Sequence, residues 1–377
     1  MKGSLLKTVA WAGLLSTVAA GAAYAGGFSR GTAPTDLLYE DGNFNMRFDT
    51  RVVIPHQEFS KNANPALVGT NFYETYIIPS VGVKFNITDT LRCVGTYTQN
   101  TGSDAEYASP KPSPSGLLMP PKLSESFHTD EFGATCALRF DVGPGVLSLL
   151  GGAFVEELTY DRLSAIGGGA TANLELKGEE YGWRGGLAYE IPDIRLRAEV
   201  LYRSGTEYGA EGTVGTPIGP VPAFGTGSLP QSVELNLRSG VAEGWLVFGQ
   251  VKWTDWSVLN ALTVTTPALP VPLVDTYNWR DGWTLTGGVV HSFNDVFAGQ
   301  VSLTWDEGVA TGWDLRGDTW TLALGGRVRA PIGGEFRFGA GFSYLEGVEE
   351  TQYAAPLNEA TDSGYAIGLN VGYIIQW

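Results

Sequence analysis

Hydrophobic and polar residues alternate with a period of two along most of this chain. Between positions 44 and 54 the even-numbered residues are mostly apolar, whereas the odd-numbered residues up to 51 are polar or charged. The first set is Phe44, Met46, Phe48, Thr50, Val52 and Ile54, and the second is Asn45, Arg47, Asp49 and Arg51. Because a β-strand sends successive side chains to opposite faces, this pattern predicts a strand with one apolar and one polar face.

The same alternation recurs in about 14 segments, each long enough to cross a bilayer at a tilt of roughly 45°. These segments are 43–55, 72–85, 91–102, 131–140, 146–159, 178–191, 193–204, 230–240, 245–256, 281–293, 296–306, 318–330, 335–345 and 364–377. Short connections alternate with long ones, as in barrels with tight turns at one rim and long loops at the other. We therefore predict an all-β fold, a 14-stranded antiparallel transmembrane β-barrel.

A soluble β-sandwich would show the same alternation, because its inner faces are apolar and its outer faces polar. The segments, however, exceed the usual strand length of about 5–6 residues. Tryptophans also cluster at segment ends, as in the interfacial girdles of membrane barrels. The last segment ends on the aromatic residue Trp377, which resembles the insertion signal of outer-membrane barrels and indicates the barrel-assembly machinery as a partner.

The composition narrows the choice of fold further. Aromatic residues make up 12% of the chain and charged residues 17%, which excludes a disordered chain and a coiled coil. Hydrophobic residues make up 43%, too few for a bundle of membrane helices. The net charge of −16 disfavours nucleic acid as a partner.

The N-terminus is typical of a secretory signal peptide. Lys2 and Lys7 flank the start of an uncharged run that ends at Ala23, and Ala23-Tyr24-Ala25 is a small-x-small cleavage site. We therefore expect residues 1–25 to be removed and residues 43–377 to form the barrel.

Several short motifs follow one another in the order seen in one family of barrels. The most specific pair is Leu229-Pro230-Gln231, which opens one predicted strand, and Trp253-Thr254-Asp255-Trp256-Ser257, near the end of the next. The others are Pro79 to Phe85, Leu91 to Gly102, Gly182 to Glu190, Tyr202-Arg203-Ser204, Asp306-Glu307-Gly308 and Ser343 to Gly347. Together they resemble the FadL-type outer-membrane transporters of long-chain fatty acids and other hydrophobic compounds.

The resemblance implies that residues 26–42 form a short N-terminal hatch inside the lumen. It implies passive uptake of hydrophobic small molecules, such as long-chain fatty acids, through an interior pocket that Phe28 reaches. The ligand would leave sideways through a gap at a kink in the third strand, here at Asn100, Thr101 and Gly102. It further implies a monomer in the outer membrane of a Gram-negative bacterium, surrounded by lipid and lipopolysaccharide.

Two apolar groups could contact such a ligand. The group in a predicted loop contains Ile218, Val221 and Phe224, and the group in the hatch contains Phe28, Leu37, Leu38 and Tyr39. Exposed apolar loops indicate a landing surface for a hydrophobic compound, although loops can also pack on one another. The hatch residues could equally pack against the barrel wall.

The polar strand faces place charges inside the predicted barrel. The basic candidates are Arg47, Arg51, Arg195, Arg197, Arg203 and Lys252. An inward arginine could pair with a carboxylate headgroup, or the charges could form ion pairs that brace the lumen. Glu156 and Glu157 are adjacent in a strand, so only one should point inward. A negative charge there would not attract a fatty-acid carboxylate and is compatible with an uncharged ligand.

The remaining candidate chemistry is sparse. Cys93 and Cys136 fall on apolar faces of neighbouring strands, where a disulfide and two unpaired cysteines are equally compatible with the pattern. The histidines lie in separate segments, without a His-Glu-x-x-His or Gly-x-Ser-x-Gly motif. We therefore expect no enzyme, metal or cofactor, and an open general porin or a purely structural barrel are the alternatives to a transporter.

Overall fold

The structure is a computed structural model that describes residues 27–112, 120–217, 219–267, 269–331, 333–353 and 357–376. The predicted signal peptide, Ile218 and Trp377 lie outside these residues.

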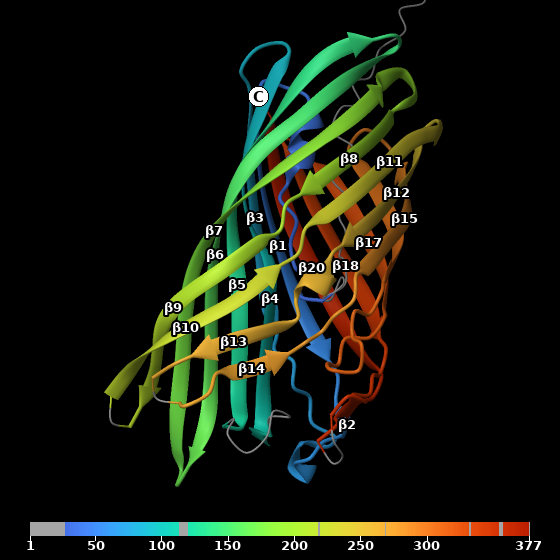
Figure 1. Ribbon diagram of the computed structural model, residues 1–377. Helices are drawn as coiled ribbons and strands as arrows, with labels where there is room; N and C mark the ends of the chain where they lie inside the picture. Colours follow the sequence, from blue (N-terminus) through green and yellow to red (C-terminus); the bar gives the residue numbers. More distant parts are fainter. Residues whose placement is uncertain are drawn as a thin grey trace, which may run out of the picture.

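Fourteen strands in the described part of the chain form one closed antiparallel barrel (Figure 1). The barrel closes where β1 pairs with β3 on one edge and with β20 on the other. In order, the wall contains β1 (Phe44–His56), β3 (Tyr76–Asn86), β4 (Leu91–Lys111), β5 (Lys122–Val142), β6 (Gly145–Gly167), β7 (Ala170–Ile191), β8 (Leu196–Arg203), β11 (Ser232–Ala242), β12 (Trp245–Thr254), β15 (Gly282–Ser292), β16 (Phe297–Asp306), β17 (Thr319–Arg329), β18 (Glu335–Leu345) and β20 (Gly364–Gln376). The predicted 14-stranded barrel is confirmed.

The apolar face of the wall strands is turned outward and the polar face inward. Along β18, the exposed side chains of Phe336, Phe338 and Phe342 alternate with the buried side chains of Arg337 and Ser343. A strand in a soluble protein would bury its phenylalanines. An outward apolar band around a polar interior is the arrangement that a lipid surround favours.

Strands β4 to β7 are much longer than a bilayer requires, with 21 to 23 residues each. They continue through 103–111, 122–130, 160–167 and 170–177, stretches that the sequence pattern assigned to long loops. That assignment was wrong because the outer face becomes polar there, with Asp161, Glu175 and Lys177 exposed. The alternation of side-chain direction continues, but the apolar face that reveals it in a sequence is lost.

Four further strands form a side sheet attached to the extended part of β7 (Figure 1). Its strands are β9 (Thr206–Thr216), β10 (Gly219–Leu229), β13 (Ala261–Thr265) and β14 (Leu273–Thr276), paired in that order. The predicted loop 205–229 is therefore largely strand, whereas the described part of the predicted loop 257–280 contains only the two short strands β13 and β14. Apolar residues of this sheet pack against Leu174 and Leu176 of β7. The buried ones are Ala210 of β9, Ala223 of β10 and Val264 of β13.

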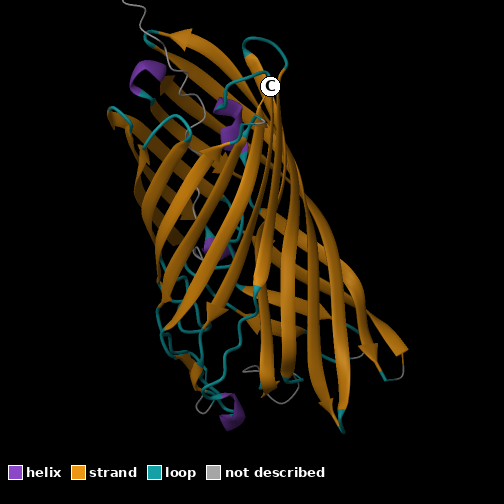
Figure 2. Ribbon diagram, turned by 180° about the vertical axis from the view of Figure 1, so that it is seen from behind, coloured by secondary structure: helices purple, strands orange, loops and turns teal. Residues whose placement is uncertain are grey.

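The only helices in the described residues are short 3₁₀ turns, drawn in purple in Figure 2. They are η1 (Thr35–Tyr39), η2 (Pro65–Leu67), η3 (Pro192–Ile194) and η4 (Trp256–Val258). None of these helices has the length and apolar content needed to span a membrane.

Cys93 and Cys136 form a disulfide between β4 and β5. The two residues lie directly opposite each other in the antiparallel register of these strands. The sequence left open whether the two cysteines are paired. The strand register decides this, because it brings their sulfur atoms together.

A cap of loops covers the barrel end opposite the short turns. It contains β2 (Phe59–Lys61) and β19 (Ala360–Thr361), which pair with each other, around an apolar cluster of Phe59, Leu67, Phe72, Tyr73 and Leu315. Glu350 is buried in this cap, and its Oε2 accepts a hydrogen bond from the backbone N–H of Glu359 at 2.9 Å. Burial, opposed by the Lys111 ammonium, raises the pKa of Glu350 to about 8.

The raised pKa of Glu350 makes the packing of the cap sensitive to pH. A carboxyl group whose folded pKa lies above its unfolded value stabilises the fold at low pH, and this contribution disappears as the pH rises through about 8. We expect backbone amides of residues 346–353 to exchange faster at pH 9 than at pH 6, after correction for intrinsic rates. Glu350→Gln should remove this difference, and equal protection of the wild type at both pH values would contradict the assignment.

Candidate functional site

The N-terminal segment runs along β4 inside the wall. Ser29 lies opposite Thr101 in an isolated β-bridge. The N–H groups of Arg30 and Gly31 donate to the carbonyl oxygens of Asn100 (2.8 Å) and Gln99 (2.9 Å). The N–H of Gly102 donates in turn to the carbonyl of Phe28 at 2.9 Å. The segment thus acts as a short extra strand beside β4.

Farther along, η1 is attached to the barrel wall near the short-turn end. Asp36 accepts two hydrogen bonds of 2.8 Å from Arg47, and Tyr39 donates to Glu199. Leu37 and Leu38 are fully buried among wall residues of β4, β5, β6 and β20. Leu37, Leu38 and Tyr39 therefore pack against the wall and do not join the cluster around Phe28.

The ring of Phe28 lies in a cage of aromatic side chains. Ring centroids are 4.6 Å away for Phe127, 4.5 Å for Trp279 and 5.6 Å for Tyr277, and Trp256 lies farther out at 6.2 Å. Phe28 is only 6% exposed. Edge-to-face contacts of this kind stabilise aromatic pairs beyond the burial of their area. We call this set the Phe28 cage.

An apolar cavity of about 60 Å³ adjoins the Phe28 cage. It extends from Phe28 and Phe127 to Leu176 and to Gly225 of β10. On β10, Ala223 is buried, Val221 on the same face is half-buried, and Phe224 on the opposite face is 48% exposed. Phe224 does not line this cavity, because the strand pairing of β10 turns its side chain outward and Gly225 meets the cavity instead. The landing surface expected from Val221 and Phe224 stays a prediction.

The wall is interrupted between β3 and β4. Their pairing runs from Asn86 opposite Arg92 to Ser80 opposite Thr98 and stops there. Beyond Thr98, β4 continues beside β5 with a register shift between Gln99 and Thr101, which makes Asn100 the extra residue of a β-bulge. The predicted kink at Asn100, Thr101 and Gly102 therefore coincides with the bulge and with the end of β3–β4 pairing.

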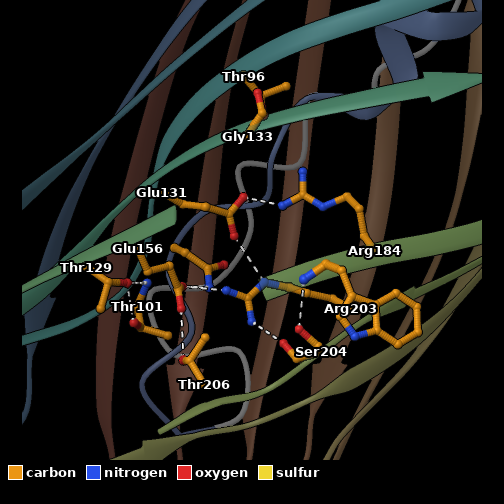
Figure 3. Close-up of polar contacts among 12 residues, drawn as sticks. Thr96, Thr101, Thr129, Glu131, Gly133, Glu156, Arg184, Arg203, Ser204 and Thr206 are labelled. Carbon is orange, nitrogen blue, oxygen red and sulfur yellow. Dashed lines mark hydrogen bonds and ion pairs between the residues drawn. The ribbon is translucent and has the colours of Figure 1, made fainter. Parts of the chain in front are cut away.

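A buried network of charges holds the lumen side of this bulge. Figure 3 shows Arg203 between Glu131 and Glu156, with Arg184 on the far side of Glu131. Glu156 is fully buried and Glu131 is 1% exposed. Glu156 also accepts hydrogen bonds from Asn100 (3.0 Å), Thr206 (3.0 Å) and Tyr208 (3.1 Å). One carboxylate thus connects the bulge to Tyr208, which lines the apolar cavity.

The adjacent Glu157 is exposed on the outer face, as strand alternation requires. Of the other predicted lumen charges, Arg47, Arg51, Arg197 and Lys252 line a polar cavity of about 300 Å³ on the short-turn side of the Phe28 cage. Arg195 differs from its prediction, because it lies in the turn after η3, with a left-handed backbone (φ 54°), and β8 begins after it. In the described part of the chain, no group of three or more His, Cys, Asp or Glu residues could hold a metal ion.

Comparison with known proteins places this geometry in context. Residues 130–308 match the family described as outer membrane protein transport protein (OMPP1/FadL/TodX). The resemblance to the FadL-type family is confirmed. The matched range contains Glu131, Glu156, Arg203 and Tyr208 of the site, as well as Trp256 and Trp279 of the cage.

Solved structures of the FadL type share the fold at low sequence identity. A Pseudomonas aeruginosa FadL homologue aligns with a TM-score of 0.71 and 12% identity, over 91% of this chain and 92% of that chain. The P. putida toluene transporter TodX aligns with a TM-score of 0.64 and 13% identity, over 92% and 93%. The Ralstonia pickettii toluene transporter TbuX aligns with a TM-score of 0.61 and 12% identity, over 91% and 92%. No curated protein matches the chain significantly.

Several residues of the site carry no usable signal in the sequence. Phe127, Tyr277 and Trp279 lie in stretches assigned to loops, and only folding brings them to Phe28. Trp256 could have been found, because it belongs to the FadL-type motif Trp253 to Ser257.

Proposed function

We propose that this chain carries small uncharged hydrophobic compounds, about the size of one aromatic ring, across the outer membrane of a Gram-negative bacterium. In this proposal the ligand binds at the Phe28 cage and leaves through the break between β3 and β4. The observation that carries the proposal is the cage itself, in which a phenyl ring of the protein occupies a nearly closed aromatic site.

The dimensions of the site support a small ligand. The phenyl side chain of Phe28 has the shape of a monoaromatic hydrocarbon, and the adjoining cavity adds about 60 Å³. An apolar cavity of about 150 Å³ is known to stay dry and to bind benzene. If Phe28 moves aside, the cage and cavity together offer a site of this kind, in which each buried CH₂ group contributes about 0.8 kcal/mol.

The charges near the site support an uncharged ligand. Arg203 is already paired with two buried carboxylates, Glu131 and Glu156. A fatty-acid carboxylate would have to displace one of them, at a large desolvation cost. Arg316 lies 5.0 Å from the Phe28 ring, but it also contacts Tyr73, Ser103 and Asp314.

The alternative function is an open general porin. The contacts of η1 with Arg47 and Glu199 oppose this function, because they hold the segment inside the lumen. Single-channel recordings in planar bilayers separate the two readings, since a stable large ion current would contradict a transporter of this type.

The direct test is uptake of radiolabelled toluene and of radiolabelled oleate by cells that lack other FadL-type proteins. We expect expression of this chain to accelerate toluene uptake strongly and oleate uptake little, relative to cells with an empty vector. Faster oleate uptake with unchanged toluene uptake would overturn the proposed ligand class, and no acceleration of either would overturn the proposed function.

A further inference from the structure

The side chain of Arg30 stands in the break between β3 and β4. The outer side of this break is a cavity of about 380 Å³, whose lining includes Ile77, Gln99, Asp104 and Arg30. The inner side opens into the polar lumen cavity, which Arg30 also lines. Among the described residues, Arg30 is the only one that lines both cavities. Arg30 therefore lies between the lumen and the outside of the wall.

Two contacts keep the side chain of Arg30 in this position. Its guanidinium forms an ion pair with Asp104 and lies 4.1 Å from the centre of the Tyr76 ring. Asp104 is held in turn by the hydroxyl of Ser126 on β5. The side chain of Arg30 is only 4% exposed. An ion pair between partly buried groups is stronger than one at the surface, yet it involves a single carboxylate and can break.

The backbone of β4 leaves room for this arrangement. A Cβ atom at Gly102 would lie 2.7 Å from Cζ of Arg30 and 2.8 Å from its Nε. Gly102 is not among the glycines with a positive φ angle, so its backbone does not itself demand glycine. Glycine at this position therefore makes space for Arg30, rather than making the kink.

We propose that Arg30 is the gate of the wall opening, closed by Asp104 and Tyr76 and opened when the segment Phe28–Gly31 moves away from β4. This gate rests on the proposed function, since it controls the exit of the same ligand. A closed gate also keeps lipid tails out of the polar lumen while no ligand passes. Because Phe28 and Arg30 are two residues apart in one extended segment, a ligand that displaces Phe28 also pulls on Arg30.

Release of the gate is tested with radiolabelled toluene as the probe. Arg30→Ala and Asp104→Asn should each raise the rate of toluene uptake about ten-fold, which corresponds to about 1.4 kcal/mol. Gly102→Ala should raise it as well, by expelling Arg30. The matched control is Gly95→Ala on the same strand, where a Cβ would meet no atom within 4 Å, and it should leave uptake unchanged.

Locking of the gate is the decisive arm. Ser29 and Thr101 lie directly opposite each other, as do the natively disulfide-bonded Cys93 and Cys136. The double variant Ser29→Cys/Thr101→Cys should abolish toluene uptake when oxidised and regain it on reduction, with the wild type under the same reductant as the control. Heat-modified migration on gels confirms that the locked barrel is folded.

The outcomes separate the gate from the function. Suppose that the wild type takes up toluene. The gate alone is then overturned if the oxidised double variant still takes up toluene, or if Arg30→Ala takes it up at the wild-type rate. Absence of uptake by the wild type and by every gate variant overturns the proposed function, and the gate with it. Wild-type uptake of toluene that is faster in Arg30→Ala and blocked in the oxidised double variant supports the gate.

Discussion

Glu156→Ala is expected to destabilise the barrel by roughly 3–5 kcal/mol, the range typical of a buried ion pair that loses one partner. The carboxylate of Glu156 is fully buried, and it pairs with Arg203. Without it, Asn100, Thr206 and Tyr208 lose this acceptor, and Arg203 loses one of its two ion pairs and keeps the one with Glu131. The measurement is the midpoint of guanidinium unfolding in detergent micelles, followed by tryptophan fluorescence.

The neighbouring glutamate provides a matched control. Glu157 lies one residue away on the same strand but is exposed on the outer face. Its replacement by alanine should change the unfolding free energy by no more than about 0.5 kcal/mol. Equal effects of the two substitutions would show that the buried network does not stabilise the bulge of β4.

Phe28→Ala should release the N-terminal segment from β4. Removal of a buried phenylalanine costs roughly 3–5 kcal/mol, and here the loss falls on a segment that three backbone hydrogen bonds attach to the wall. We therefore expect the amides of Arg30 and Gly31 to lose protection from hydrogen exchange while the barrel strands keep theirs. Unchanged protection of these two amides would contradict a role of the Phe28 cage in holding the segment.

The vacated cage should then bind a free aromatic molecule. Toluene at about 100 times its dissociation constant would stabilise the Phe28→Ala variant by about 2.7 kcal/mol, seen as a higher midpoint of thermal unfolding. Phe224→Ala is the control, because the Phe224 ring is 48% exposed and outside the cage. If toluene stabilises both variants equally, it acts on the micelle or the outer surface and not in the cage.

The strands of the barrel wall could be predicted because their outer face is apolar and their inner face is polar. Apolar and polar residues therefore alternate with a period of two along each strand. In β18, for example, each phenylalanine must face outward if Arg337 faces the lumen. The same rule predicted that only one of Glu156 and Glu157 points inward. The rule failed at the far ends of β6 and β7, where polar residues such as Asp161 and Glu175 replace the outward apolar residues. The sequence there no longer alternates between apolar and polar residues, so the strands are not recognised.

The candidate site could be predicted only in part. The family resemblance singles out Phe28 and the region of Asn100 to Gly102, yet nothing local indicates which rings surround Phe28. Phe127, Trp256 and Trp279 come from distant parts of the chain and meet only after the wall has closed. Apolar character in a sequence also carries no direction, so only the strand pairing of β10 shows that Gly225 faces the apolar cavity and Phe224 faces away from it.

The sequence by itself determined the elements of this protein that depend on nearest neighbours: the central part of each wall strand, the outward face of that part and the even number of crossings. The tertiary structure alone decided what depends on closure of the barrel. It brought Arg30 to Asp104 and Tyr76 in the break between β3 and β4. The physical reason is that alternation is a local consequence of backbone geometry, whereas a site inside a barrel is made of side chains that share no local pattern.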